Sequence, residues 1–303
     1  MRSEIIGIVK SAYDEFSKAQ TLEMFRKMCD IRHFEENVKR AYDSGLMKIP
    51  IYLSIGQEAI PAALSTVYKN PAISGQHRAH GYYLAYGGDE EGLVDELLGR
   101  ESGCAQGMGG SASIHSPEIE MIGHDGLMGS NIPIATGYAF AKNFRKPEKT
   151  NVLAVMGDSS AEEDYVGSSL GWAATKKLPI LYVCEDNNLS ILTEKKTRRS
   201  WEMSDLANSY GFESVDITDD PWTIMHYAKK LQENLPAFMN IHTSRDTWHA
   251  GSGKDEPPKE WSWWRRFDLV KRRLVENGLA QKVNEVELNS IERMSSLWKS
   301  RIN

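Results

Sequence analysis

Residues 151–193 constrain the fold more than any other part of the chain, because they predict a strand, a helix and a second strand in succession. Two apolar runs, residues 152–156 and 179–184, flank a stretch with small and apolar residues at helical spacing, residues 161–177. Strand, helix and strand of this length are typical of a parallel βαβ crossover. Both strands are apolar throughout, as strands are when helices cover both faces of a sheet. We therefore predict an α/β fold with a mostly parallel sheet and helices on both faces.

The rest of the chain extends this pattern. Helix-like stretches at 203–210 and 221–234 precede strand-like stretches at 212–215 and 237–241. Apolar residues recur at helical spacing through residues 1–45 and through most of the C-terminal part, and Gly45 is placed to end an N-terminal helix.

Bulk properties exclude several classes of protein. A chain of 303 residues is long enough to bury a large core, as one α/β domain or two smaller ones. The formal charge of −6, without a long basic block, argues against a nucleic-acid partner. No apolar run has the length of a membrane span and no signal-peptide pattern opens the chain, so we expect a cytoplasmic protein without a membrane partner. The three cysteines show neither metal-type spacing nor a disulfide framework.

Polar residues follow both strands of the 151–193 segment. Asp158 comes just after the first strand and Asn187 just after the second. Ligands of open parallel sheets bind beyond the carboxyl ends of the strands, and neighbouring strands lie about 4.8 Å apart, or twice that with one strand between them. Carboxylate, amide and carbonyl oxygens suit a hard cation such as magnesium, which completes its shell with water and phosphate oxygens. We therefore predict a magnesium ion that holds a diphosphate.

The spacing of these residues matches a known signature. Gly157-Asp158-Ser159, the 27 residues 160–186 and Asn187-Asn188 together resemble the GDG…NN motif of thiamine diphosphate enzymes. A Gly-Asp pair after a strand is by itself an ordinary turn, but the joint spacing on a βαβ unit favours a cofactor site. The intervening Ala-Ala-Thr-Lys-Lys-Leu-Pro and Val-Cys-Glu-Asp-Asn-Asn segments resemble the alpha subunit of the decarboxylating component of 2-oxo acid dehydrogenases, oxidoreductases that act on pyruvate, branched-chain 2-oxo acids or acetoin.

The resemblance implies a thiamine diphosphate-binding fold and a ligand set. Asp158 and Asn187 are expected to ligate magnesium with their side chains and Leu189 with its carbonyl, while Ser159 and Ser160 lie against the diphosphate. Ser159 replaces the family's glycine, so its side chain is expected to crowd or hydrogen-bond the diphosphate. The whole chain, residues 1–303, is expected to be one diphosphate-binding domain with N-terminal helices at 1–45 and a helical tail at 257–303.

Residues 77–81, His-Arg-Ala-His-Gly, suit an anionic ligand, because the planar fork of an arginine binds phosphate in a bidentate manner. They resemble the family's Tyr-Arg-Ala-His-Gly. The resemblance implies that Arg78 contacts the diphosphate and that His80 lies near the reaction centre. His77 replaces the tyrosine, and we group it with the cofactor-binding residues. The alternative for Arg78 is an ordinary surface pair with a carboxylate.

Three further segments resemble the family. Residues 56–59, Gly-Gln-Glu-Ala, place Glu58 either near the active site or simply in the first turn of a helix, where a carboxylate is favourable. The Gly-rich residues 99–111 are not a P-loop, because no Gly-Lys-Ser/Thr follows, and we assign them no chemistry. Residues 126–137 resemble the segment whose backbone grips the aminopyrimidine ring, at positions that match Gly126 and Met128.

Near the C-terminus, residues 243–249 resemble a family segment whose arginine and histidine face the active site. The matching positions are Arg245 and His249. A histidine titrates near neutrality, so His249 is suited to protonate or orient the substrate. Ala250 replaces a serine that is phosphorylated in some relatives, so that form of regulation is not expected here.

One catalytic group is missing from the resemblance. The family supplies the glutamate at the pyrimidine ring from a separate beta subunit, so we predict an α2β2 assembly, with a lipoyl acyltransferase as a further candidate partner. Three interpretations stay open: acyl transfer from a 2-oxo acid to lipoamide, a thiamine-dependent carboligase or non-oxidative decarboxylase acting on an aldehyde or sugar, and a non-catalytic cofactor-binding subunit. The residues Ser159, Asp164 and Ser168 differ from those of the family, which is why the carboligase or non-oxidative decarboxylase interpretation stays open.

Overall fold

The centre of the molecule is a six-stranded parallel sheet with the order β2-β1-β3-β4-β8-β7. The computed structural model describes residues 6–124, 126–145, 151–254 and 265–302. The strands of the sheet are β1 Ala72–Ser74, β2 Met121–Ile122, β3 Val152–Gly157, β4 Ile180–Asp186, β7 Glu213–Thr218 and β8 Ala237–His242. Two short strands, β5 Leu189–Ser190 and β6 Thr193–Glu194, form a separate antiparallel hairpin.

The βαβ unit predicted from the sequence is confirmed. β3 and β4 are adjacent and parallel, and α6 (Asp164–Lys176) connects them. The helix begins later than predicted, because Asp158–Glu162 forms a 3-10 helix and Glu163 is extended. The site residues that follow β3 therefore lie on this tight turn and not on the long helix.

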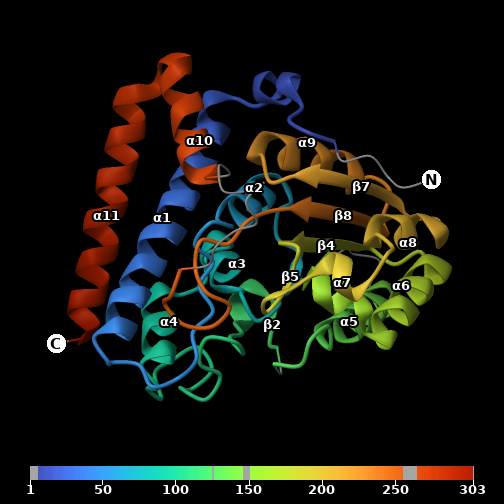
Figure 1. The fold of residues 1–303 in the computed structure, drawn as a ribbon, viewed down its shortest axis with the longest axis horizontal. Helices are drawn as coiled ribbons and strands as arrows, with labels where there is room; N and C mark the ends of the chain where they lie inside the picture. The colour runs from blue at the N-terminus through green and yellow to red at the C-terminus, as the bar shows by residue number, and fades with distance from the viewer. Residues whose placement is uncertain (1–5, 125, 146–150, 255–264, 303) are drawn as a thin grey trace.

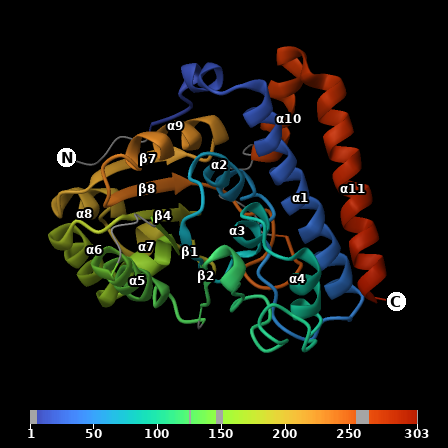
Figure 2. The ribbon, with the colours of Figure 1, turned by 180° about the vertical axis from the view of Figure 1, so that it is seen from behind.

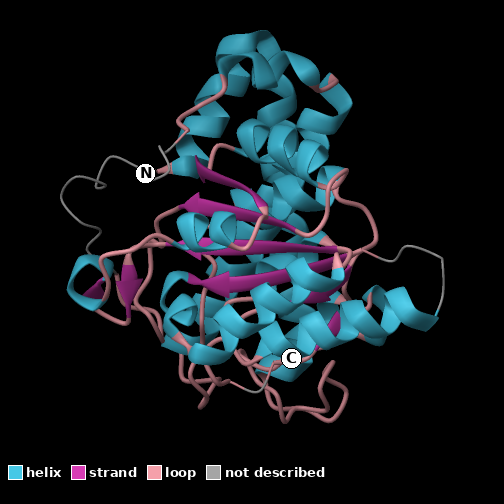
Figure 3. Ribbon diagram, turned by 90° about the vertical axis from the view of Figure 1, so that its right-hand side faces the viewer, coloured by secondary structure: helices cyan, strands magenta, loops and turns pink. Residues whose placement is uncertain are grey.

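Helices cover both faces of the sheet (Figure 3). Successive strand residues point to opposite faces, so Val152, Ala154 and Met156 join one apolar cluster while Leu153 and Val155 join the other. The first cluster lies under α5, α6 and α8, and the second under α1, α2, α3, α9 and the C-terminal helices. The helices other than α6 are α1 Lys18–Asp43, α2 Ala59–Val67, α3 His80–Ala85, α4 Glu90–Leu97, α5 Asn131–Arg145, α7 Lys195–Arg198, α8 Met203–Ser209, α9 Pro221–Leu231, α10 Arg266–Leu274 and α11 Ala280–Ile302.

The two ends of the chain pack together. α1 and α11 lie side by side along one edge of the molecule (Figures 1 and 2), and the rings of Phe34 and Trp298 meet with their centroids 5.6 Å apart. A break at Gly278, with φ of +78°, separates α10 from α11. Most of the described part of the predicted N-terminal helical region is helical: Lys10–Glu15 is a 3-10 helix, α1 follows, and Gly45 is left-handed just after the helix ends. Residues 6–9 are an exception, because they are not helical and Ile6 forms a β-bridge with Ile217. Residues 1–5 and 257–264 of the predicted helical regions lie outside the described residues.

The order of the strands determines where a ligand can bind. The chain leaves β1 for β2 on one side and then returns to β3 on the other side of β1. Ligands of open α/β sheets bind in the crevice at such a switch point, beyond the carboxyl ends of the strands. Among the helices of the described ranges, none is both long and apolar enough to cross a membrane.

Candidate cofactor site

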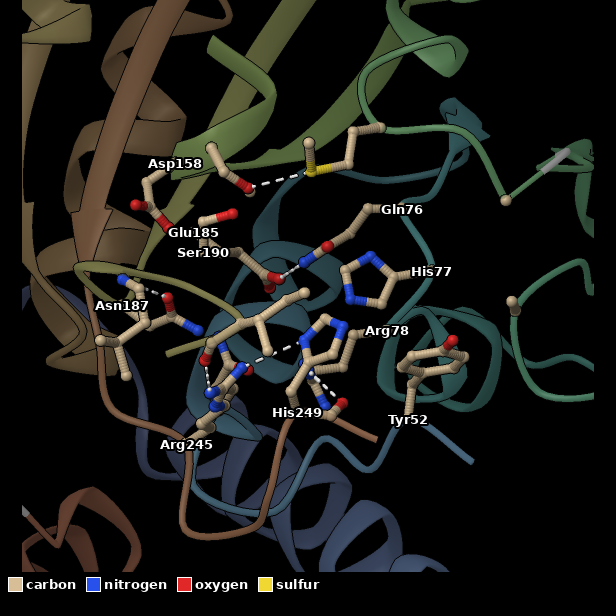
Figure 4. Close-up of a pocket in the computed structure, with 18 residues that line it drawn as sticks. Tyr52, Gln76, His77, Arg78, Asp158, Glu185, Asn187, Ser190, Arg245 and His249 are labelled. Atoms are coloured by element: carbon tan, nitrogen blue, oxygen red, sulfur yellow. Dashed lines mark hydrogen bonds between the residues drawn. The ribbon is translucent and has the colours of Figure 1, made fainter. Parts of the chain in front are cut away.

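A pocket of about 250 Å³ lies at this switch point, where the loops after β1, β3, β4 and β8 meet (Figure 4). Asp158 and Asn187 lie on one side of it, and His77 and Tyr52 on the other. Ten of the twelve residues predicted for the site line this pocket: His77, Arg78, Gly126, Met128, Asp158, Ser159, Asn187, Leu189, Arg245 and His249. The other two, His80 and Ser160, are buried outside its lining.

Asp158 stands at the end of β3, next to a second carboxylate. Gly157 pairs with Glu185 across β3 and β4, so the following residues, Asp158 and Asp186, end neighbouring strands. Burial and the neighbouring Asp186 raise the pKa of Asp158 to about 7. One oxygen of Asp158, Oδ2, accepts a hydrogen bond from Arg198 Nη2 at 2.5 Å. A cation is therefore the natural neighbour of this carboxylate.

The turn after β4 carries the other predicted ligands. Asp186 Oδ1 accepts the N–H of Asn188, and Asn187 Oδ1 accepts the N–H of Leu189, both at 3.0 Å. Asn188 adopts a positive φ of +64°, which asparagine tolerates better than most residues. Burial disfavours the charge on Asp186, yet His242 and Lys195 hold its pKa below the usual range. The turn is thus built on an ionised carboxylate.

The opposite wall of the pocket is basic and aromatic. Arg78 donates from Nη1 to the carbonyl of Leu53 at 2.7 Å and from Nη2 to the carbonyl of His249 at 3.1 Å. Burial, followed by the charge of Arg78, lowers the pKa of His77 well below 6.5, so its imidazole is neutral. Its Nε2 is buried without a protein partner. The rings of Tyr52, His77 and His249 lie 4.9–5.7 Å from one another. This wall offers positive charge and an unpaired nitrogen to an anion.

Arg245 and His249 come together as predicted. Arg245 Nη1 lies 3.3 Å from His249 Nδ1, and Arg245 Nη2 donates to the carbonyl of Ile191 at 2.7 Å. Ile191 belongs to the loop between β5 and β6, so this contact joins the loop after β8 to the loop after β4. The arrangement fixes a cation and an imidazole side by side on the pocket wall.

His80, predicted to lie near the reaction centre, is outside the pocket lining. Its side chain is fully buried and outside the pocket lining, between Glu35, 3.1 Å from Nδ1, and Ser111, 2.9 Å from Nε2. The Ser111 hydroxyl also accepts the N–H of Tyr52 at 2.9 Å. His80 therefore lies directly behind the pocket wall, bonded to Glu35 and Ser111. Ser160 is also behind the wall, in the 3-10 turn after β3.

The Gly-rich loop, left without chemistry above, wraps around one carboxylate. Glu96 is fully buried, and its two oxygens accept four backbone N–H groups at 2.7–2.8 Å. The donors are Ala105, Gly107, Gly109 and Gly110. A side chain on Gly103 would place its Cβ 2.5 Å from the Cα of Glu96. Gly103 is therefore required for the loop to approach the helix that carries this carboxylate, and the loop positions Ser111.

The segment that carries Gly126 and Met128 contacts side chains of the β3–β4 unit. Gly126, with φ of +87°, donates its N–H to His124 Nδ1 at 2.8 Å. The carbonyl of Met128 accepts from the Tyr165 hydroxyl, and the Ser159 hydroxyl lies 3.3 Å from the sulfur of Met128. Ser159, the departure from the glycine of the motif, thus contacts Met128.

Sequence reasoning missed a buried pair in the middle of the pocket. Glu185 accepts hydrogen bonds from Gln76 Nε2 and from the Tyr82 hydroxyl, the latter at 2.9 Å. Burial raises the pKa of Glu185 to about 7, although both donors oppose this. The available signal was position alone: Gln76 precedes the His77-Arg78 pair, and Glu185 ends β4.

Of the two interpretations given for Glu58, the structure favours the structural one. Glu58 is buried at the start of α2, pairs with Arg32 and accepts the N–H of Gly56 at 3.0 Å. The neighbouring Gln57 lines the pocket instead, with its Oε1 buried and without a protein partner.

Comparison with known proteins places this arrangement in a family. The profile of the dehydrogenase E1 component matches residues 26–294. The chain belongs to this family. It is 31% identical over 294 residues to the pyruvate dehydrogenase E1 component subunit alpha of Rhizobium meliloti (strain 1021), an alignment that covers 92% of this chain and 83% of that protein. It is 34% identical over 239 residues to the mitochondrial alpha-1 subunit of Oryza sativa subsp. japonica, covering 77% of this chain and 61% of that protein.

Solved structures agree on the fold. The transketolase of Leishmania mexicana superposes with a TM-score of 0.56 at 14% identity, and a transketolase mutant from Pichia stipitis with a TM-score of 0.53 at 16% identity. The chain spans about half the length of these transketolases, 46% and 48%. The predicted thiamine diphosphate-binding fold and the identification as an alpha subunit of a decarboxylating E1 component are confirmed. The family implies thiamine diphosphate as cofactor and a beta subunit as partner.

Proposed function

We propose that this chain, together with a beta subunit, decarboxylates a 2-oxo acid and passes the acyl group to lipoamide. Pyruvate is the first substrate to test, because the relatives named above are pyruvate dehydrogenase subunits. The observation that carries the proposal is the convergence of Asp158, Asn187, Arg78 and His77 on one pocket from three different strand ends. Bound thiamine diphosphate supplies the carbanion and the electron sink for such a reaction.

Magnesium is part of this proposal, with Asp158 and Asn187 as side-chain ligands and Leu189 as a carbonyl ligand. These oxygen donors lie at the ends of neighbouring strands and suit a hard cation that keeps water and phosphate in its shell. Among the described residues no group of three or more His, Cys, Asp or Glu side chains is arranged to hold a metal. A site that keeps several positions for water and phosphate needs only one carboxylate, so the predicted set is compatible with that finding.

The basic wall fits the remaining parts of the ligand. We propose that Arg78, the Nε2 of His77 and Ser159 contact the diphosphate, since all three residues line the pocket. Arg245 and His249 form the other cationic corner, which suits the carboxylate of a 2-oxo acid. We propose that Arg245 binds that carboxylate and that His249 holds or moves a proton at the substrate oxygen.

The pyrimidine-side glutamate is proposed to come from the partner. Of the two carboxylates that line the pocket in the described part of the chain, Glu185 is bonded to Gln76 and Tyr82, and Asp158 is the proposed metal ligand. An apolar surface on α5 and α6 supports an assembly. Phe140, Phe144 and Trp172 gather on the outer faces of α5 and α6, with ring centroids 5.9–6.1 Å apart, and Phe144 is 82% exposed. Such surfaces usually mark protein interfaces.

Native mass spectrometry of the complex purified from its own cells, without added cofactor, tests the assembly. We expect a second chain of similar size in an α2β2 complex, with thiamine diphosphate and magnesium retained. A homo-oligomer that retains neither would contradict the proposal and favour a non-catalytic subunit.

Activity tests the chemistry. We expect release of carbon dioxide from pyruvate, with acyl transfer that depends on a lipoyl domain. Asp158→Ala is expected to lose cofactor retention and activity while the complex still assembles. Asp164→Ala is the matched control, because Asp164 is an exposed carboxylate at the start of α6. Products formed from an aldehyde acceptor without a lipoyl domain would identify a carboligase instead.

A further inference from the structure

One helical turn supplies cations to both strand ends of the proposed metal site. α7, Lys195–Arg198, carries two long cationic side chains three positions apart, which places them on the same side of a helix. Lys195 Nζ lies 2.6 Å from Asp186 Oδ2, and Arg198 Nη2 lies 2.5 Å from Asp158 Oδ2. The two carboxylates end the neighbouring strands β4 and β3 and are 0% and 2% exposed.

Arg198 and Lys195 each bind one oxygen of a carboxylate whose other contacts lie toward the pocket or toward the turn after β4. Asp158 lines the pocket but Arg198 does not, so the guanidinium reaches the carboxylate from outside the cavity. Asp186 is also outside the lining, and its Oδ1 accepts the N–H of Asn188 while Lys195 binds Oδ2. Lys195 thus acts on the turn that carries Asn187, and Arg198 acts on Asp158 itself.

The turn is tied down on several sides. The backbone N–H of Lys195 donates to the carbonyl of Asn188 at 2.9 Å, and its ammonium group also contacts Glu202 at 2.8 Å. Arg198 Nη1 donates to Glu162 at 2.6 Å, within the 3-10 turn that begins at Asp158. The next residue, Arg199, donates to the carbonyl of Asp158 at 2.5 Å. α7 is therefore fixed to both strand ends through backbone and side-chain contacts.

We propose that Lys195 and Arg198 are positioning residues that set the separation of Asp158 and Asn187 for magnesium. The inference rests on the proposed function, since it requires a metal at these two residues. Mutation of a residue that orients a metal's ligands typically lowers metal affinity 10- to 100-fold. Because the carboxylates lie on separate strands, a single rigid turn that grips both fixes the spacing more firmly than either loop alone.

The experiment measures magnesium binding by isothermal titration calorimetry, on the alpha–beta complex stripped of metal and saturated with thiamine diphosphate. We expect Arg198→Gln and Lys195→Gln each to raise the dissociation constant for magnesium about tenfold or more. Lys196→Gln is the matched control: Lys196 is the next residue on α7, its side chain is 79% exposed, and it contacts Glu194 on the surface. It removes the same charge and is expected to leave the constant unchanged.

A conservative change separates positioning from general packing. Arg198→Lys keeps the charge but loses the planar fork, so we expect it to recover part of the affinity. The rise in its thermal midpoint on adding a fixed excess of magnesium should be smaller than that of the wild type, because the stabilisation depends on the ratio of magnesium concentration to dissociation constant, whereas a packing defect would lower the midpoint equally with and without magnesium. If Arg198→Gln does not assemble, the comparison of Arg198→Lys with Lys196→Gln decides the question.

Two results would overturn the inference. Magnesium constants for both Gln variants within about twofold of the Lys196→Gln control would show that α7 does not position the ligands. Tighter binding by Arg198→Gln would show that the guanidinium competes with the ion. A wild-type complex that binds no magnesium in the presence of thiamine diphosphate would instead refute the proposed function.

Discussion

Replacing Glu96 with glutamine is expected to loosen the Gly-rich loop. The carboxylate accepts four backbone N–H groups, two on each oxygen, at 2.7–2.8 Å. An amide keeps one accepting oxygen but turns an N–H₂ group toward the other two donors. Two charge-assisted hydrogen bonds are then lost, and two buried N–H groups remain unpaired.

The size of the effect follows from those two bonds. Hydrogen bonds to a charged group contribute about 1.5–3 kcal/mol each. The loss is therefore about 3–6 kcal/mol, and relaxation of the loop favours the lower end. A change of about 3 kcal/mol in the free energy of local opening corresponds to about 100-fold faster exchange of the protected amides.

Hydrogen exchange of the assembled complex, followed by mass spectrometry over residues 99–111, measures this opening without requiring two-state unfolding. Glu101→Gln is the matched control, because Glu101 is an exposed carboxylate in the same loop. Exchange in Glu96→Gln within about threefold of that control would refute the reasoning, since it would mean that the carboxylate does not hold the loop.

Three further predictions concern stability. Burial and the charge of Arg78 hold His77 neutral, so the unfolded chain binds more protons than the folded chain below about pH 6.5. The free energy of unfolding of the cofactor-free complex should therefore fall from pH 7 to pH 5, by at most about 1.4 kcal/mol per pH unit. Thermal midpoints of His77→Tyr should not show this decrease. Burial, followed by the charge of Lys69, lowers the pKa of Lys27 to about 8, so the unfolded chain binds more protons between about pH 8 and 10.5. Lys27→Met should therefore raise stability by about 1 kcal/mol at pH 7, after allowing for partial exposure, and the gain in thermal midpoint should vanish near pH 10. Gly107 has φ of +73°, and a Cβ there would lie 2.7 Å from the carbonyl of Arg100. Gly107→Ala should therefore lower the free energy of unfolding by about 1–3 kcal/mol and speed hydrogen exchange in residues 99–111. Equal hydrogen exchange in the variant and the wild type would contradict this.

The parts of the fold that follow from local sequence were predictable. The β3–α6–β4 unit was predicted because each strand is apolar throughout and the segment between the strands has the length of one helical crossover. Asp158 and Asn187 followed from it, since both stand just after a strand. The position of β8 between β4 and β7 was not predictable, because it depends on packing between segments far apart in the chain.

The residues that were missed or misplaced share one property: their partners are distant in sequence. Glu185 meets Gln76 across 109 positions, and Arg198 meets Asp158 across 40. His80 was expected near the reaction centre from its motif, but its contacts with Glu35 and Ser111, which hold it behind the wall, could not be predicted from spacing. Spacing along the chain identifies residues near a strand end, whereas the direction of a side chain is decided by partners that the local sequence does not contain.

The two carbonyls bound by Arg78 have a consequence for the order of events during synthesis. Leu53 precedes the arginine, but His249 follows it by 171 positions and lies beyond the end of β8. A nascent chain that has emerged only as far as β4 therefore holds Asp158 and Asn187 but lacks half of the wall that faces them. Domains fold as units during synthesis, and β8, which lies between β4 and β7, can join the sheet only after it has emerged. We expect a stalled chain that ends before residue 237 to retain no cofactor, and the loading of thiamine diphosphate to be a step that follows translation.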